Sequence, residues 1–308
     1  MVMMTYRMPD SITQITDTGE YDEFDLNEFF KATGDGEDAK FKHENYVQQW
    51  LDLIRGSGIK NVYTSLKVGG DSQYFPFQHA AVKNLLTHTL WFMPSVASCH
   101  AMKNLMMQRA NTFYHDYEII VCAGTKAGIG SKALIPLRKK MTDNPLRTKT
   151  ITLSCGKLTT GVTVKPWTGL FMLRNTTSPE TYFQTAFRVQ SPWTIGIQDS
   201  PNKEEIIKDE CYVFDFAPNR ALRLVTEYSC KLNIEPVDPE IKVREFVKFL
   251  PVLCFDGSSM GQVNARAVLD IGTVGTSGSQ LAKKFESARL VHVDNTTLAL
   301  SLIHISEP

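Results

Sequence analysis

The sequence predicts an α/β protein in which a parallel sheet is sandwiched by helices. Short, continuous apolar runs recur between about residues 86 and 230, and amphipathic segments separate them. Strands buried on both faces are apolar without alternation, and parallel strands need long, usually helical, connections. Polar, turn-forming residues also follow these runs, at the edge where open parallel sheets bind ligands.

Five apolar runs are predicted as strands of one α/β domain. They are HTLWFMP (88–94), YEIIVCAG (117–124), TKTITLSC (148–155), TGLFMLR (168–174) and ECYVFDFAP (210–218). Their length and their β-branched and aromatic residues favour strands over helices. A further strand-like run, VMMTYR, stands near the start of the chain.

The segments between these runs are predicted as helices. They are 95–108, 131–141, the stretch from Ser178, and 219–232. Ser95 and Ser178 are suited to cap the helices that follow them, and Pro179 fits the first helical position. Outside the domain, 43–58 and 242–255 are also predicted as helical.

Composition restricts the classes of function. Lys+Arg and Asp+Glu both number 33, which argues against bulk electrostatic binding of nucleic acid but allows a local basic groove. The six cysteines and seven histidines show no metal-ligand spacing, so we expect reduced thiols and no metal site. No apolar run approaches the roughly 20 residues of a membrane span. We therefore expect a cytoplasmic protein without a membrane partner.

Two polar features follow the third and fourth predicted strands. Thr159, Thr160 and Gly161 form a small-residue turn whose backbone amides can approach a phosphate closely. Gln184 and Arg188 stand four residues apart, which places both on one face of a helix. The alternative for this pair is an ordinary surface helix whose polar side chains face water.

Together these features resemble motifs V and VI of superfamily 2 helicases and DNA translocases. Motif V is a Thr-x-Gly turn, matched by 159–161, and motif VI reads Gln-x-x-x-Arg-x-x-Arg. The run HTLWFMPSVASCHAM resembles motif IV, which opens the second RecA-like lobe, a P-loop NTPase-type lobe. The resemblance covers roughly 88–230. It is closest to the restriction-enzyme-like DEAD/DEAH helicases of bacteria and phages, where a tryptophan follows motif V as Trp167 does here.

The resemblance implies roles at a shared ATP site. Arg188 would be the catalytic arginine finger, and Gln184, Gly161 and Thr163 would join it in binding the nucleotide. The second arginine of motif VI is replaced by Ser191, so Arg188 acts alone or with a helper. Arg174 is a candidate helper, with a surface salt bridge as the alternative.

Nucleic-acid contacts are expected from four residues near motifs IV and V. They are Lys157, Thr159, Thr160 and Ser95. Hydroxyls and amines at such positions bind the sugar–phosphate backbone without reading sequence. For Ser95, helix capping is the simpler alternative. Asp215 and Arg220 are read as a pair that braces a turn, with a catalytic role as the alternative.

The resemblance also divides the chain. Residues 1–85 would be the end of a first lobe or an inter-lobe accessory segment, 86–230 the second RecA-like lobe, and 231–299 a helical accessory segment. The last nine residues, 300–308, resemble a translated sequencing adapter, so we expect a fragment. The ligands of Mg²⁺ and the phosphate loop are expected on a missing first lobe. AGIGSKA (127–133) has the wrong order for a phosphate loop, and DEFD (22–25) reads as the acidic start of a helix.

The expected function is the C-terminal lobe of an ATP-dependent DNA helicase or translocase in restriction–modification or phage DNA metabolism. It would use ATP with Mg²⁺ when complete and be inactive as this fragment. Expected partners are DNA, bound weakly by the fragment, the first RecA-like lobe, and nuclease or methyltransferase modules. The alternative is a non-catalytic α/β module that binds DNA or protein.

Overall fold

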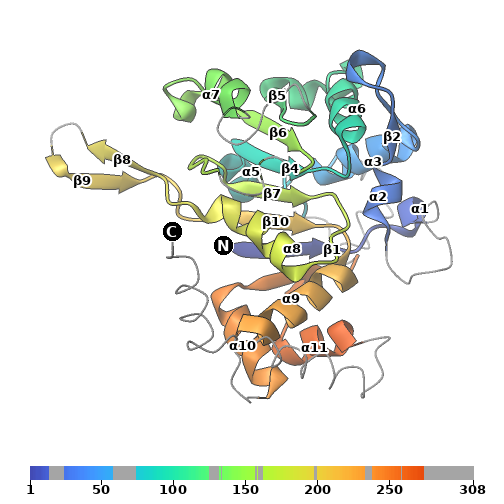
Figure 1. Cartoon of the computed structure of the whole chain (residues 1–308), viewed down its shortest axis with the longest axis vertical. Coiled ribbons are helices and arrows are strands. Elements are labelled where there is room, and N and C mark those ends of the chain that lie inside the picture. Colours follow the sequence, from blue (N-terminus) through green and yellow to red (C-terminus); the bar gives the residue numbers. More distant parts are fainter. Residues whose placement is uncertain are drawn as a thin grey trace, which may run out of the picture.

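The chain was analysed as a computed structural model of residues 1–308 (Figure 1). The structure describes residues 1–13, 24–57, 74–124, 132, 134–156, 158, 162–197, 200–232, 238–257 and 259–273. Among them lies a central sheet of eight strands, in the order β12-β11-β1-β10-β7-β4-β6-β5. Its neighbouring strands pair in parallel, except for the antiparallel pair β11–β12.

The strands of this sheet are short, and the central ones are buried along their whole length. Their bounds are β1 (Val2–Tyr6), β4 (His88–Phe92), β5 (Glu118–Val121), β6 (Thr150–Ser154), β7 (Gly169–Met172), β10 (Tyr212–Asp215), β11 (Val252–Phe255) and β12 (Met260–Gln262). Every residue of β4, β6, β7 and β10 is buried. This burial explains why the sequence shows continuous apolar runs.

Helices cover both faces of the sheet. One face is packed against α1 (Asp10–Thr13), α2 (Leu26–Phe29), α3 (Glu44–Ile54), α5 (Ala80–Leu85) and α6 (Val96–Met106). The other is packed against α7 (Ile135–Met141), α8 (Pro179–Ala186), α9 (Pro218–Leu232), α10 (Pro239–Phe249) and α11 (Ala265–Thr273). The two hydrophobic cores lie on opposite faces of the sheet. The fold is therefore α/β with a mostly parallel sheet between helices, consistent with a RecA-like lobe.

Smaller elements complete the described chain. They are the 3₁₀ helices η1 (Gly36–Asp38), η2 (Arg109–Asp116), η5 (Pro145–Arg147) and η6 (Phe187–Gln190), the pair β2 (Ala32–Thr33) and β3 (Lys40–Phe41), and the pair β8 (Thr194–Ile197) and β9 (Ser200–Ile206). Strands β8 and β9 form an antiparallel hairpin. Figure 1 shows this hairpin projecting away from the sheet and its helices.

The predicted strands between 88 and 218 are confirmed, as are the predicted helices after Ser95, after Ser178 and over 219–232. Of the helix predicted over 131–141, α7 begins at Ile135, and Ser131 and Ala133 lie outside the described residues. Each of the five apolar runs contains one strand, namely β4, β5, β6, β7 and β10. The side chain of Ser95 accepts a hydrogen bond from the amide of Ser98, and that of Ser178 accepts one from Thr181. Trp91, Trp167 and Trp193 are buried.

The predicted helix over 242–255 is wrong in its second half. Helix α10 ends at Phe249, and β11 begins at Val252. Pro251 separates them, because proline has no amide hydrogen with which to continue the helix.

The sheet also extends beyond residues 86–230. Strand β1 lies between β10 and β11, with Thr5 opposite Asp215 on one side and Cys254 on the other. Strands from the segments 1–85 and 231–299 thus belong to the same sheet as the central segment. Apolar side chains from all three segments pack together in the two hydrophobic cores.

Candidate functional site

The segment that resembles motif VI contacts Val162, the residue after the segment that resembles motif V, on the sheet face that is packed against α8. Arg188, in η6, donates a hydrogen bond of 2.8 Å from Nη1 to the carbonyl oxygen of Val162. Val162 directly follows the predicted Thr-x-Gly turn in the sequence. Lys157, Thr159, Thr160 and Gly161 lie outside the described residues. Arg188 is half-buried, whereas Thr163, beside Val162, is exposed.

Gln184 and Arg188 are less closely aligned than an uninterrupted α-helix would make them. Helix α8 ends at Ala186, and the chain tightens into η6 from Phe187 onwards. Fewer residues per turn rotate Arg188 further around the axis than the four-residue spacing predicts. Gln184 is exposed, and its side chain has no hydrogen-bond partner in the described part of the chain.

A buried lysine that the sequence analysis did not select holds this region together. Lys208 donates hydrogen bonds from Nζ to three backbone carbonyl oxygens, at 2.7 Å to Lys165, 3.0 Å to Trp167 and 2.9 Å to Val189. Only 9% of Lys208 is exposed. Burial of the ammonium lowers the pKa of Lys208 to about 8.

The expected nucleic-acid contact Ser95 is engaged in capping α6. Its hydroxyl accepts the amide of Ser98 at 3.0 Å and lies 2.8 Å from the hydroxyl of Ser98. The Ser98 hydroxyl in turn donates to the carbonyl of Phe30 at 2.7 Å. The capping alternative is therefore confirmed, and a phosphate contact by Ser95 stays a prediction.

Arg174 is placed at the carboxyl end of β7. Its Nη1 donates to the carbonyl of Cys155 at 3.3 Å, and its guanidinium lies 5.5 Å from the centroid of the Phe92 ring. The carbonyl partners of Lys208 show that Val189, next to Arg188, lies near Trp167, before the amino end of β7. Arg174 is thus not placed beside Arg188 as a helper would be, and it forms no ion pair with a described residue. Arg188 follows the far end of α8, toward the amino ends of the strands, so it does not lie at the carboxyl-end edge where the sequence predicted the ligand.

Two thiols lie close together near Arg174. The Cys99 thiol forms a hydrogen bond with Cys155, and this bond, together with the charge of Arg174, lowers the pKa of Cys155 to about 7. The same contact and burial raise the pKa of Cys99. All six cysteines are free, in agreement with the expected reduced thiols.

Asp215 and Arg220 form a buried ion pair. Arg220 Nη2 lies 2.8 Å from Oδ1 and 3.0 Å from Oδ2 of Asp215. The Tyr182 hydroxyl donates to the same carboxylate at 2.9 Å, as does the amide of Ala217 at 2.8 Å. Arg220 Nη1 also donates to the side chain of Asn175. Both terminal nitrogens of Arg220 are thus bonded within the protein, while its buried Nε has no hydrogen-bond partner among the described residues. The pair braces the turn after β10, as predicted.

Two sequences, DEFD (22–25) and AGIGSKA (127–133), were set aside as partial matches to nucleotide-binding motifs. Asp25, the last residue of DEFD, caps α2 by accepting the amides of Asn27 at 2.8 Å and Glu28 at 3.1 Å. This confirms that it belongs to the start of a helix, while Asp22 and Glu23 lie outside the described residues. Most of AGIGSKA also lies outside them; Lys132 alone is described.

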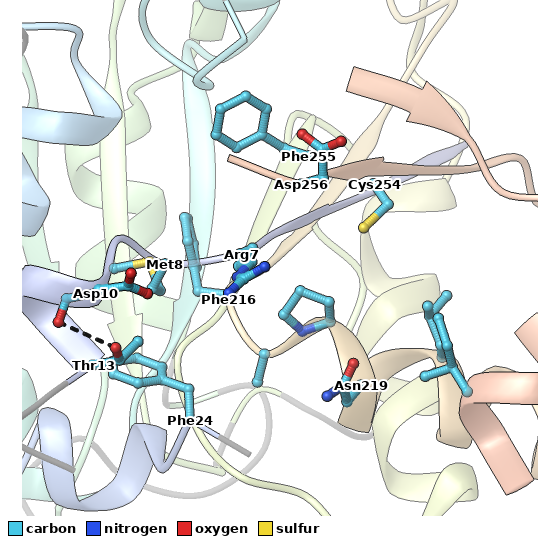
Figure 2. Close-up of a pocket in the computed structure, with 14 residues that line it drawn as sticks. Arg7, Met8, Asp10, Thr13, Phe24, Phe216, Asn219, Cys254, Phe255 and Asp256 are labelled. Atoms are coloured by element: carbon cyan, nitrogen blue, oxygen red, sulfur yellow. Dashed lines mark hydrogen bonds between the residues drawn. The ribbon is translucent and has the colours of Figure 1, made fainter. Parts of the chain in front are cut away.

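A cavity of about 500 Å³ opens at the carboxyl ends of β1, β10 and β11. Arg7 lies in its middle, with Asp10 on one side and Asn219 on the other (Figure 2). Asp256 and Phe255 close another side (Figure 2). None of the predicted site residues that the structure describes lines this cavity.

The described part of the chain offers neither a metal-binding cluster nor a membrane-spanning helix. Among the described residues, no group of three or more His, Cys, Asp or Glu side chains is arranged so that it could hold a metal ion. No described helix combines the length and apolarity that crossing a bilayer requires.

Comparison with known proteins indicates one relationship. No protein-family model matches the chain. Over 174 residues the chain is 34% identical to a Mycoplasma pneumoniae protein, RM.MpnORF110P C-terminus, described as a candidate type II restriction enzyme and methyltransferase. The alignment covers 56% of this chain and 23% of that relative. The chain is related to a restriction–modification protein.

Proposed function

We propose that this chain is the second RecA-like lobe of an ATP-dependent superfamily 2 DNA helicase or translocase that works in a restriction–modification system. The observation that carries the proposal is the hydrogen bond from Arg188 to the Val162 carbonyl. It joins the Gln-x-x-x-Arg segment to the segment that follows the Thr-x-Gly turn. Two motifs with a common role need such proximity, and 26 residues separate these two positions in the chain.

The chemistry proposed for this site is stabilisation of charge during phosphoryl transfer. Arg188 would bind phosphate oxygens of ATP with its planar guanidinium, and Gln184 and Thr163 are polar and exposed enough to contact the nucleotide. ATP with Mg²⁺ supplies the transferable phosphoryl group. The phosphate loop and the Mg²⁺ ligands are proposed to belong to a first lobe, as the resemblance to superfamily 2 helicases implies.

The proposed partner is DNA, with nuclease or methyltransferase modules in the same system. The name of the Mycoplasma pneumoniae relative gives both a restriction enzyme and a methyltransferase, which supports nuclease or methyltransferase modules as partners. Such a protein would act in the cytoplasm, where bacterial DNA lies. The overall balance of 33 basic and 33 acidic residues requires the DNA contacts to be local.

A non-catalytic DNA- or protein-binding module is the second candidate. One observation favours it: Nη1 of Arg188 is already engaged by a backbone carbonyl. In this alternative, Arg188 serves only to hold the chain after β6 against η6.

One assay distinguishes the helicase proposal from the binding module. It measures the release of phosphate from ATP by the complete protein, with and without DNA. The helicase proposal expects hydrolysis that rises when DNA is added. A complete protein that binds DNA but hydrolyses no ATP would leave only the binding module.

A further inference from the structure

Lys208 connects the two segments of the proposed ATP site through a single ammonium group. Two of its acceptors, the carbonyls of Lys165 and Trp167, belong to the segment that runs from Val162 to β7. The third, the carbonyl of Val189, belongs to η6, one residue after Arg188. Both ends of the Arg188–Val162 contact are therefore held close to Lys208.

The hydrogen bonding of Lys208 is complete without a carboxylate. An ammonium has three donors, and the three carbonyl oxygens use all of them. No described acidic side chain forms an ion pair with Lys208. Burying a charge costs free energy, and the three hydrogen bonds of the Lys208 ammonium offset part of that cost. Because these contacts are to backbone carbonyls, they fix the course of the chain both in the 162–168 segment and in η6.

The neighbouring hairpin fixes the position of Lys208 itself. The amide of Ile207 donates to the carbonyl of Trp193 at 2.9 Å, which closes the base of the β8–β9 hairpin. The ring of Trp193 lies against His88, with 6.3 Å between the ring centroids. Lys208 directly follows Ile207, which is bonded to Trp193, and the Trp193 ring packs against His88 at the start of β4. These contacts fix the backbone at Lys208.

We propose that Lys208 is a positioning residue for Arg188, whose ammonium holds the 162–168 segment and the 3₁₀ turn η6 in the arrangement that aims the guanidinium at the nucleotide. This inference rests on the proposed function. Lys208 does not touch the nucleotide; it acts through Arg188. Arg188 would then hold its position before the partner lobe and ATP bind. This preorganisation lowers the entropy that is lost on binding.

The test replaces Lys208 in the complete protein and measures DNA-stimulated hydrolysis of ATP. Lys208→Met keeps an unbranched side chain that is one atom shorter and removes every donor. Lys208→Gln keeps two N–H donors without a charge and serves if the methionine variant does not fold. Lys231→Met is the matched control, because Lys231 pairs with Glu180 of α8 on the surface at 2.7 Å.

We expect Lys208→Met to lower kcat by roughly ten- to hundredfold, the scale of a small misplacement of a catalytic group, with little change in KM for ATP. Lys208→Gln should lose less, and Lys231→Met should match the wild type. In a protein that already carries Arg188→Ala, adding Lys208→Met should cause no further loss of kcat, because the residue to be positioned is gone.

Three outcomes separate the claims. A folded Lys208→Met or Lys208→Gln variant with wild-type kcat overturns the role of Lys208. A loss that adds in full to that of Arg188→Ala also overturns it, because Lys208 would then act independently of Arg188. Absence of ATP hydrolysis by the wild-type complete protein overturns the proposed function itself, and the role of Lys208 with it.

Discussion

The guanidinium of Arg188 and the carbonyl oxygen of Val162 are joined by a hydrogen bond of 2.8 Å. This contact brings the residue of greatest catalytic interest to the segment just after the predicted phosphate-binding turn. Arginine presents five donors in a planar fork, so the bond to this carbonyl does not by itself exclude a bond to a phosphate. The same contact would also hold the loop if the protein had no catalytic role.

The chain on its own is predicted to bind ATP no more tightly than about millimolar and not to hydrolyse it. One guanidinium, one amide and a few backbone amides offset too little of the entropy lost when a flexible triphosphate is ordered. Isothermal titration of residues 1–299 with a non-hydrolysable ATP analogue measures this. Micromolar binding would mean that AGIGSKA or DEFD had been set aside wrongly.

Removal of Arg220 is predicted to destabilise the fold strongly. Asp215 is fully buried, and Arg220→Met would leave its carboxylate without a counter-ion. Breaking such a pair typically costs about 3–5 kcal/mol in the free energy of unfolding. Urea unfolding measures it, with Arg244→Met as the control. The Arg244–Glu240 pair is exposed, so the control should change stability by at most about 1 kcal/mol. Equal effects of the two variants would contradict this account of the Asp215 site.

Sequence patterns predicted most of the sheet because its strands are buried on both faces. The run around Trp91 and Phe92 is apolar throughout for that reason. The β8–β9 hairpin was missed since its residues, TIGIQDSPNKEEI, form no continuous apolar run. Strand β11 was missed because its apolar residues prolong the pattern of α10 across Pro251.

The candidate site could be predicted only in part. Gln184 and Arg188 stand out because their residue types and spacing resemble a motif. Lys208 does not, because its partners are backbone carbonyls 19, 41 and 43 residues away, and every residue type has a carbonyl. No side-chain pattern encodes such a contact, so it appears only in the folded chain.

Stability at alkaline pH is predicted to depend on Lys208. Burial lowers its pKa from 10.5 to about 8 in the folded protein. Between these values the unfolded chain keeps the proton that the folded protein has lost. The unfolded state then binds more protons, so the contribution of Lys208 to the free energy of unfolding rises with pH.

The comparison of wild type with Lys208→Met from pH 7 to 10.5 tests this linkage. The difference in free energy of unfolding should stay level up to about pH 8 and grow in favour of the wild type above it. Val189→Ala removes buried side-chain atoms without an ionisable group, so its difference from the wild type should not depend on the state of Lys208. A difference for Lys208→Met that falls with pH would contradict the assigned direction.

The most direct test of the central claim is the effect of Arg188→Ala on the complete protein, with binding and hydrolysis of ATP measured separately. An arginine finger acts mainly in the transition state, so hydrolysis should fall by roughly a thousandfold or more while the affinity for ATP stays nearly unchanged. Arg188→Lys should restore little, because an ammonium lacks the planar fork. Near-normal DNA-stimulated turnover by Arg188→Ala would show that Arg188 only supports the Val162 segment, and would contradict its role as a finger.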